Sequence, residues 1–204
     1  HIAYAPQVLI VNPSLPVQSV KDLIALARAK PGELNYGVSS IAGATQLAAE
    51  LFNLMARVRM TQIPYKGAPA MLVDLMGSRI HLSFATMPSA MGFVRSGKLR
   101  AIAVTGSKRS ALVPAVPTVA ENGLPGYEMV AWQGLLAPKA TPAALIQLLN
   151  RETVAIVQQP EVRKQLAAEG GEAVGNTPEE FARWLKAEIA KWTKVVKEAN
   201  IRAE

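Results

Sequence analysis

The sequence contains no cysteine, which rules out disulfides, thiolate nucleophiles and metal sites built on sulfur. It has only two histidines, His1 and His81, and no group of carboxylates at the spacing of metal ligands, so we expect no metal site and no cofactor. No apolar run reaches the roughly 18 residues that a membrane-spanning helix needs. What remains is a globular chain of 204 residues, 50% hydrophobic, which is long enough to bury a sizeable core.

Basic residues outnumber acidic ones, 22 against 15, for a formal net charge of +7. Such a balance suits a nucleic acid, an anionic membrane or an anionic small solute. The basic side chains are scattered through amphipathic segments beside acidic neighbours, and aromatic residues make up only 5% of the chain. Because nucleic-acid surfaces gather basic and aromatic side chains together, we expect no nucleic-acid partner.

An extended run, a loop rich in small residues and an apolar-periodic run follow one another at 36–52, which predicts strand, loop and helix. Small side chains let backbone N–H groups approach a ligand closely. Ser39, Ser40 and Thr45 add hydroxyls beside the helix N-terminus, where unpaired amides and the helix dipole favour an anion. From these residues alone, two interpretations stay open: a site for a carboxylate or phosphate, and an ordinary helix cap.

The first half of the chain alternates between apolar extended runs and amphipathic runs with short links. It predicts strands at 2–11, 34–38, 58–64, 80–84 and 99–105, and helices at 20–29, 44–56, 69–76 and 89–95. This alternation is typical of a parallel α/β sheet with right-handed crossovers, in which ligands bind beyond the carboxyl ends of the strands. The turns expected at that edge are 39–44, 65–67, 85–88 and 105–108.

The second half has a different character. A proline-rich stretch with a short predicted helix at 119–122 leads to an extended segment at 127–136. The remaining pattern predicts helices at 142–158 and 160–168, a brief strand at 172–174, and a long amphipathic helix from residue 178. The last helix carries an apolar stripe of Phe181, Trp184, Leu185, Ile189, Trp192, Val195 and Val196. A stripe this apolar needs a partner surface, either the α/β unit or a region upstream of His1.

Seven short blocks stand in order along the chain: 11–16 (VNPSLP), 31–36 (PGELNY), 47–52 (LAAELF), 63–67 (IPYKG), 96–101 (SGKLRA), 116–121 (VPTVAE) and 123–127 (GLPGY). In these blocks the sequence resembles the Bug or TctC-like solute receptors of tripartite tricarboxylate transporters. The resemblance covers almost the whole chain, and seven spaced blocks are far more specific than a single glycine motif.

The resemblance implies an α/β fold of the periplasmic-binding-protein (Venus-flytrap) type. Members of the family are not enzymes: they lie in the periplasm, close on a small carboxylated solute and deliver it to the membrane components of the transporter. The complete parallel-sheet lobe, domain two, is expected at 9–126. The hinge strands and the helical C-terminal part of domain one are expected at 1–8 and 127–204.

The N-terminal part of the family's domain one has no counterpart in this chain. The chain also begins without Met or a signal peptide, so we expect a truncated or processed chain. Its uncovered surface is expected to allow self-association.

In the family, one loop from each domain grips a carboxylate of the ligand, and the second-domain loop corresponds to 39–45 here. The residues expected to bind the ligand are Ser39, Ser40, Ala42, Gly43, Ala44, Thr45, Tyr65, Lys66, Gly67, Thr86 and Trp132. Ser40 and Ala42 stand where glycines are common in the family. Ala85 stands where many members have an acidic residue, which leaves recognition of an amino or hydroxyl group on the solute open.

Two other functions stay open. An α/β enzyme would use the 39–45 loop as an oxyanion or phosphate site, although Ser39 and Ser40 have no His–Asp pair in the pattern. A truncated module that binds no ligand would associate through the stripe on its last helix. Lys66 either pairs with a ligand carboxylate or is simply solvated, and His81 is expected to be a structural side chain.

Overall fold

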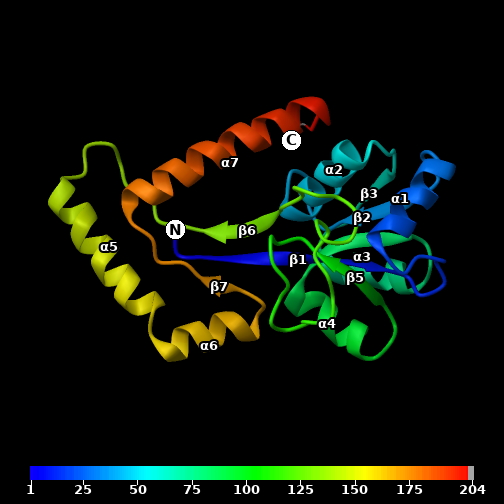
Figure 1. Ribbon diagram of the computed structural model, residues 1–204, viewed down its shortest axis with the longest axis horizontal. Helices are drawn as coiled ribbons and strands as arrows, with labels where there is room; N and C mark the ends of the chain where they lie inside the picture. The colour runs from blue at the N-terminus through cyan, green and yellow to red at the C-terminus, as the bar shows by residue number, and fades with distance from the viewer. Residues whose placement is uncertain (202–204) are drawn as a thin grey trace.

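The computed structural model describes residues 1–201, in which an α/β lobe forms one end of an elongated molecule (Figure 1). Strand β1 (Ala3–Val11) runs from the middle of the molecule into this lobe. The lobe continues with α1 (Val20–Ala29), β2 (Asn35–Val38), α2 (Ala44–Ala56), β3 (Thr61–Pro64), α3 (Ala68–Met76), β4 (Leu82–Thr86), α4 (Met87–Arg95) and β5 (Arg100–Val104). The predicted alternation of strands and helices is confirmed.

The lobe sheet has the strand order β3-β2-β4-β1-β5. β2 is parallel to β3 and β4, whereas β1 is antiparallel to both of its neighbours, β4 and β5. The prediction of an all-parallel sheet is therefore wrong for β1, which enters the sheet from the edge at which the other strands end. Because β2, β3, β4 and β5 share one direction, their carboxyl ends do meet at a single edge.

Two helices cover each face of the lobe sheet. Leu9 packs with α1 and α2, and Val8 packs with α3 and α4, because successive strand residues point to opposite faces. The contact with α3 is close at Gly37, where a Cβ would lie 2.5 Å from Ile80 Cδ1 and 2.6 Å from Met71 Cγ. The lobe is thus a three-layer α/β/α unit with a hydrophobic core on each side of its sheet.

Residues 119–122 form turns, so the helix predicted there is wrong. A reciprocal cap is nevertheless present: Glu121 N–H donates to Thr118 Oγ1 at 3.0 Å, and Thr118 N–H donates to Glu121 Oε2 at 2.8 Å. The chain turns away at Gly123, whose φ of +136° is open to glycine but not to a helix.

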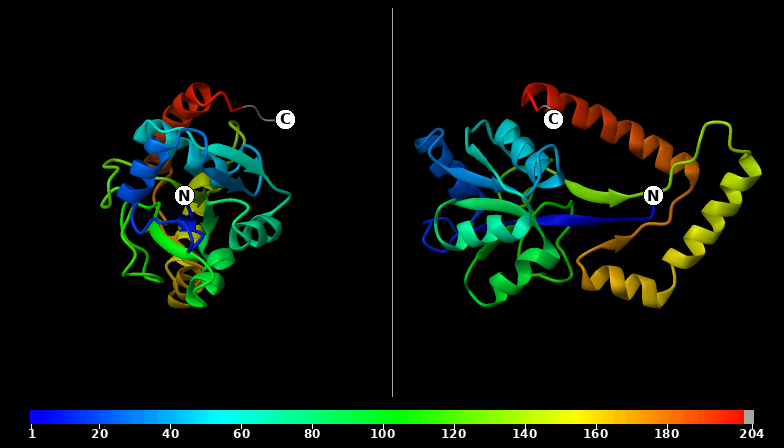
Figure 2. Two further views of the ribbon diagram at one scale, coloured as in Figure 1. Left: turned by 90° about the vertical axis from the view of Figure 1, so that its right-hand side faces the viewer. Right: turned by 180° about the vertical axis from the view of Figure 1, so that it is seen from behind.

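A second, smaller sheet joins the lobe to the rest of the chain. β6 (Val130–Gln133) and β7 (Glu172–Ala173) pair with the first residues of β1, so β1 belongs to both sheets and changes from one to the other between Pro6 and Gln7. Helices α5 (Ala143–Val157), α6 (Pro160–Ala168) and α7 (Pro178–Glu198) form an open frame around this sheet (Figure 2). None of the described helices is long and apolar enough to cross a membrane.

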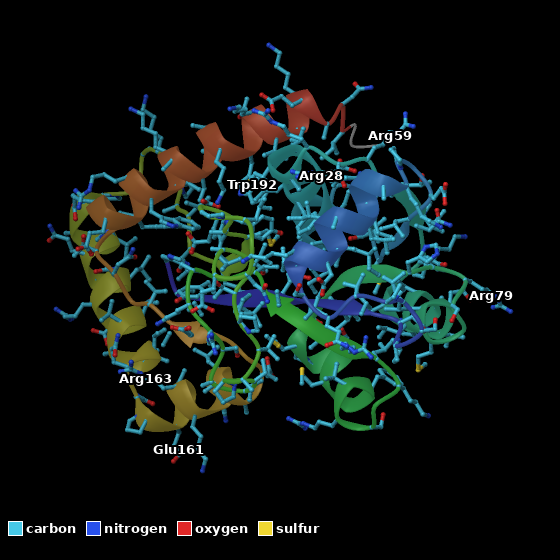
Figure 3. The ribbon with its side chains drawn as sticks, turned by 45° about the vertical axis from the view of Figure 1, so that its right-hand side comes forward. Arg28, Arg59, Arg79, Glu161, Arg163 and Trp192 are labelled. Atoms are coloured by element: carbon cyan, nitrogen blue, oxygen red, sulfur yellow. The ribbon has the colours of Figure 1, made fainter. Side chains whose placement is uncertain are left out.

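Helix α7 runs from the open frame back over the lobe. It begins with the predicted capping box, in which Thr177 and Glu180 satisfy each other's backbone N–H groups. Near its end Val195 is buried in the core beside α2, and Trp192 points toward the lobe (Figure 3). Between the two ends of the helix, Ile189 remains 58% exposed, so the lobe covers only part of the apolar stripe.

Candidate functional site

Three of the predicted groups meet at the carboxyl edge of the lobe sheet. The 39–43 loop follows β2 and leads into α2. Tyr65 N–H donates to Val38 O at 2.9 Å, and Gly67 N–H donates to Ser39 O at 3.1 Å, so the 65–67 segment lies directly beside the loop. Thr86 ends β4, the strand next to β2, at the same edge.

The 39–45 loop is held together at its base by Ser39 and Thr45. Ser39 N–H donates to Thr45 Oγ1 at 3.2 Å, and the two hydroxyl oxygens lie 3.3 Å apart. Thr45 is buried, whereas Ser40 is exposed. The pair closes the base of the loop and places both hydroxyls at the start of α2.

Ala42 has a left-handed backbone, with φ of +54°. This conformation accounts for the glycine that is common here in the family, because glycine adopts it without steric cost. Ala42 N–H donates to Gln46 Oε1 at 2.7 Å, so this amide is already occupied and is not free for a ligand in this conformation.

No side chain caps α2. Its N-cap is Gly43. The N-caps of α3, α4, α5 and α6 likewise make no side-chain bond to the helix, whereas Ser19 caps α1 and Thr177 caps α7. A Cβ on Gly43 would meet Ser40 Oγ, which would have to rotate away, and would lie 3.3 Å from Ser40 O, so the loop approaches the helix closely at this glycine. The first amides of α2 therefore face the loop without an intrahelical or side-chain acceptor, an arrangement that suits a carboxylate or phosphate.

Tyr65 turns away from the loop. Its ring packs against the core beside α3, and its hydroxyl donates to Asp74 Oδ2 at 2.9 Å. Burial and the bond to Asp74 raise the pKa of Tyr65 to about 12, so the hydroxyl stays protonated near neutral pH. Arg79 pairs with the other Asp74 oxygen at 2.7 Å, at the far end of the lobe (Figure 3). Lys66 is exposed and carries a positive charge in the turn beside the loop.

Thr86 and Trp132 have partners of their own. Thr86 Oγ1 donates to Ser89 Oγ at 2.9 Å at the start of α4. Trp132 pairs with Tyr4 across the smaller sheet and stacks edge-on against Trp184, with 5.3 Å between ring centroids. The structure therefore brings Thr86 to the edge of the loop and places Trp132 in a separate aromatic cluster.

The histidines have structural surroundings. His81 Nδ1 accepts the N–H of Asn35 at 2.9 Å, which confirms its predicted structural role, and His1 stacks on Trp184. Ala85, at the position where the family often has an acid, is buried against α4. Among residues 1–201, no three His, Asp or Glu side chains come together as metal ligands. The loop thus offers amides, hydroxyls and a nearby lysine, which is the chemistry of anion binding.

Sequence reasoning missed a polar tie where the two sheets meet. Gln7 N–H donates to Thr105 Oγ1 at 2.7 Å, and that hydroxyl in turn donates to Met129 O at 2.6 Å. One buried threonine thereby holds both strands that leave the lobe. Gln7 is only 1% exposed, and its Oε1 has no partner within the described residues. The signal in the sequence was a lone glutamine in an apolar run, which a strand pattern alone does not distinguish from a solvated position.

The chain matches, over residues 1–201, the family described as tripartite tricarboxylate transporter family receptor, TctC. The chain belongs to this family. Protein BugT of Bordetella pertussis is 37% identical over 197 residues, which cover 97% of this chain and 60% of BugT. The chain therefore spans about 60% of the length of such curated relatives.

Solved structures of the family share the fold. A protein of R. palustris solved with adipate is 41% identical, with a TM-score of 0.83 over 98% of this chain and 67% of that one. MatC from Rhodopseudomonas palustris, solved with bound malate, is 27% identical, with a TM-score of 0.75 over 95% of this chain and 67% of its own. The periplasmic-binding-protein fold that the sequence predicts is confirmed by these likenesses.

Proposed function

We propose that this chain is the larger part of an extracytoplasmic receptor that captures a small carboxylated solute for a tripartite tricarboxylate transporter. The observation that carries the proposal is the uncapped N-terminus of α2, which faces a loop already closed by Ser39 and Thr45. A carboxylate placed there would accept hydrogen bonds from the helix amides and gain from the helix dipole. The acids bound by two relatives, adipate and malate, belong to the same chemical class.

The site acts by binding and not by catalysis in this proposal. The loop itself contains no group that titrates near neutral pH. Tyr65, in the segment beside the loop, is protonated and bound to Asp74. An enzyme would need a proton acceptor in reach of the bound anion, so the proposed role is a receptor in the periplasm, where relatives of this fold are placed by their descriptions.

We also propose that residues 9–126 form the second of two domains, and that 1–8 and 127–204 belong to the first. The smaller sheet and the open frame support this division, because they have an uncovered apolar groove of about 480 Å³ between α5 and α7. Leu135, Leu149 and His1 line it. The rest of domain one would cover this groove and supply the second grip on the solute.

The test is calorimetric titration of the complete product of the gene, and of this chain alone, with adipate, malate, citrate and glutamate. The complete product is expected to bind one class of acid, and this chain alone to bind it more weakly because half of the grip is missing. Thr45→Val is expected to raise the Kd by roughly 10-fold to 150-fold, the loss of a hydrogen bond to a charged group.

A matched control is Thr61→Val, which changes an exposed threonine at the opposite end of β3, where its hydroxyl donates to Gly32 O. Its affinity is expected to stay at the wild-type value. The proposal fails if the complete product binds none of the acids, or if Thr45→Val and Thr61→Val bind equally well. Equal affinity of this chain and the complete product would contradict the proposed division of the grip.

A further inference from the structure

The left-handed turn at Ala42 needs a restraint that the loop itself does not supply. A residue with a Cβ seldom adopts a φ of +54°, and Ala42 is exposed, so packing does not hold it there. The restraint present is one hydrogen bond, from Ala42 N–H to Gln46 Oε1 at 2.7 Å. Gln46 lies in the first turn of α2, three residues after the N-cap Gly43.

The side chain of Gln46 is itself held in place by a neighbouring strand. It is only 7% exposed, and its Nε2 donates to Gln62 Oε1 on β3 at 2.7 Å. The hydroxyl of Tyr36 on β2 donates its one proton to Glu50 on α2, and its oxygen lies 3.3 Å from the same Gln62 oxygen. Tyr36 is fully buried in the core. Hydrogen bonds thus run from the exposed loop through Gln46 to Gln62 on β3, which lies beside the buried Tyr36.

The direction of the loop at Ala42 decides where the next amides point. A left-handed residue reverses the path of the chain, and Gly43 and Ala44 follow it directly into α2. If Ala42 returned to the more common right-handed or extended region, the amides after it would turn away from the space that the loop borders. The base of the loop at Ser39 and Thr45 would remain closed, since its bond does not involve Gln46.

We propose that Gln46 is a positioning residue of the anion site: its side chain holds Ala42 in the left-handed turn and so aims the amides of Gly43 and Ala44 at the solute. This inference rests on the proposed function of the 39–45 loop. Gln46 does not touch the solute. It acts by raising the fraction of molecules whose loop is ready to bind, which lowers the apparent Kd in proportion.

The first experiment needs no ligand. Hydrogen exchange of the Ala42 amide is measured by NMR in the 204-residue chain for the wild type, Gln46→Met, Gln46→Glu and Gln147→Met. Methionine matches the length of glutamine without the strong acceptor, so Gln46→Met is expected to speed exchange by about tenfold. Gln46→Glu keeps an acceptor and is expected to restore slow exchange. Gln147→Met, at an exposed site on α5, is the control and is expected to change nothing.

The second experiment titrates the complete gene product with adipate and malate as probes. Gln46→Met is expected to raise the Kd about tenfold, and Gln147→Met to leave it unchanged. Unchanged Ala42 exchange in Gln46→Met, or faster exchange without weaker binding, would overturn the positioning role. A wild-type product that binds neither probe would count against the proposed function, while the Ala42 exchange rate would still decide whether Gln46 holds the loop.

Discussion

The lobe and the open frame are built from the same kind of amphipathic helix, but the apolar faces of these helices are buried in the lobe and partly exposed in the frame. In the lobe, Phe52 on α2 and Leu75 on α3 are fully buried. In the frame, Leu149 and Ile156 on α5 are 47% and 53% exposed, and α6 has no buried residue. The comparison shows that an apolar stripe marks the face of a helix that requires a partner surface. Whether that face is buried depends on the chain around it.

The two regions are joined at few places. β1 and β6 cross between them, and Val195 at the end of α7 is buried against the lobe. Thr105 ties both crossing strands to the lobe sheet. We therefore expect the lobe to hold most of the stability of this chain, and the frame to unfold more easily.

The largest expected effect compares one leucine from each region. Leu75→Ala empties a fully buried site on α3 and is expected to lower the free energy of unfolding by about 2–5 kcal/mol. Leu149→Ala is the same change on α5, where the side chain is 47% exposed, and is expected to cost less than about 1 kcal/mol. Urea unfolding followed by far-UV circular dichroism measures both values.

Tryptophan fluorescence reports mainly on the frame and can be followed in both leucine variants. Two of the three tryptophans, Trp132 on β6 and Trp184 on α7, lie in the aromatic cluster of the frame, whereas Trp192 on α7 packs against the lobe core. In the wild type, the fluorescence transition is expected at lower urea than the circular dichroism transition. Coincident transitions, together with equal losses of unfolding free energy in the two variants, would mean that the frame is packed as well as the lobe. This result would contradict the expected difference in stability between the two regions.

A medium effect is expected where the two regions join. Thr105→Val keeps the shape but leaves Met129 O and Gln7 N–H without their hydroxyl partner, at a cost of about 1–3 kcal/mol. Thr118→Val is the matched control, because Thr118 is equally buried but bonds only within its own turn. Hydrogen exchange at Gln7 is expected to rise in Thr105→Val and to recover in Thr105→Ser. Equal exchange at Gln7 in Thr105→Val and Thr118→Val would show that the hydroxyl does not tie the strands.

The smallest effects are expected from two exposed ion pairs, one inside the lobe and one between lobe and frame. Arg79 and Tyr65 lower the pKa of Asp74 below its usual 3.8, so its stabilisation is present above that value and is lost as the pH falls through the lowered pKa. Glu172 on β7 raises the pKa of Lys108 above its usual 10.5, so that stabilisation is present below 10.5 and is lost as the pH rises through the raised pKa.

Two variants separate these pairs. Asp74→Asn is expected to flatten the acid side of the stability profile, and Lys108→Met the alkaline side. Thermal unfolding between about pH 2 and 4 and between about pH 10 and 12 measures the slopes, with changes close to experimental error at pH 7. A change on the wrong side of neutrality in either variant would contradict the assignment of the pairs.

Local chemistry allowed much of the fold to be predicted. Residues 20–29 and 44–56 carry their own periodicity, and Ser19 caps the first of these helices as expected. The helix expected at 119–122 does not form although its cap is present, because the chain turns away at Gly123 immediately after it. The orientation of β1 was missed because the direction in which a strand enters a sheet depends on a connection between two sheets, which periodicity does not reveal.

Some features of the candidate site were likewise predictable from the sequence, and others were not. Small residues and hydroxyls before an apolar-periodic run were enough to predict the 39–45 loop and its place at the strand ends. The distant cluster of Trp132 was not predictable, because its partner Trp184 is remote in sequence. The occupied amide of Ala42 and the outward turn of Tyr65 have partners only four and nine residues away, but these bonds depend on side-chain directions that periodicity does not reveal.

By itself the sequence determined most of the secondary structure, the family and the position of the small-residue loop at 39–45, because these depend on periodicity, capping and short motifs within a few residues. Tertiary structure alone decided that β1 runs antiparallel between β4 and β5, that Gln62 on β3 holds Gln46, and that Thr105 joins two crossing strands. The physical reason is that hydrogen bonds and packing between distant segments form only when the whole sheet is assembled.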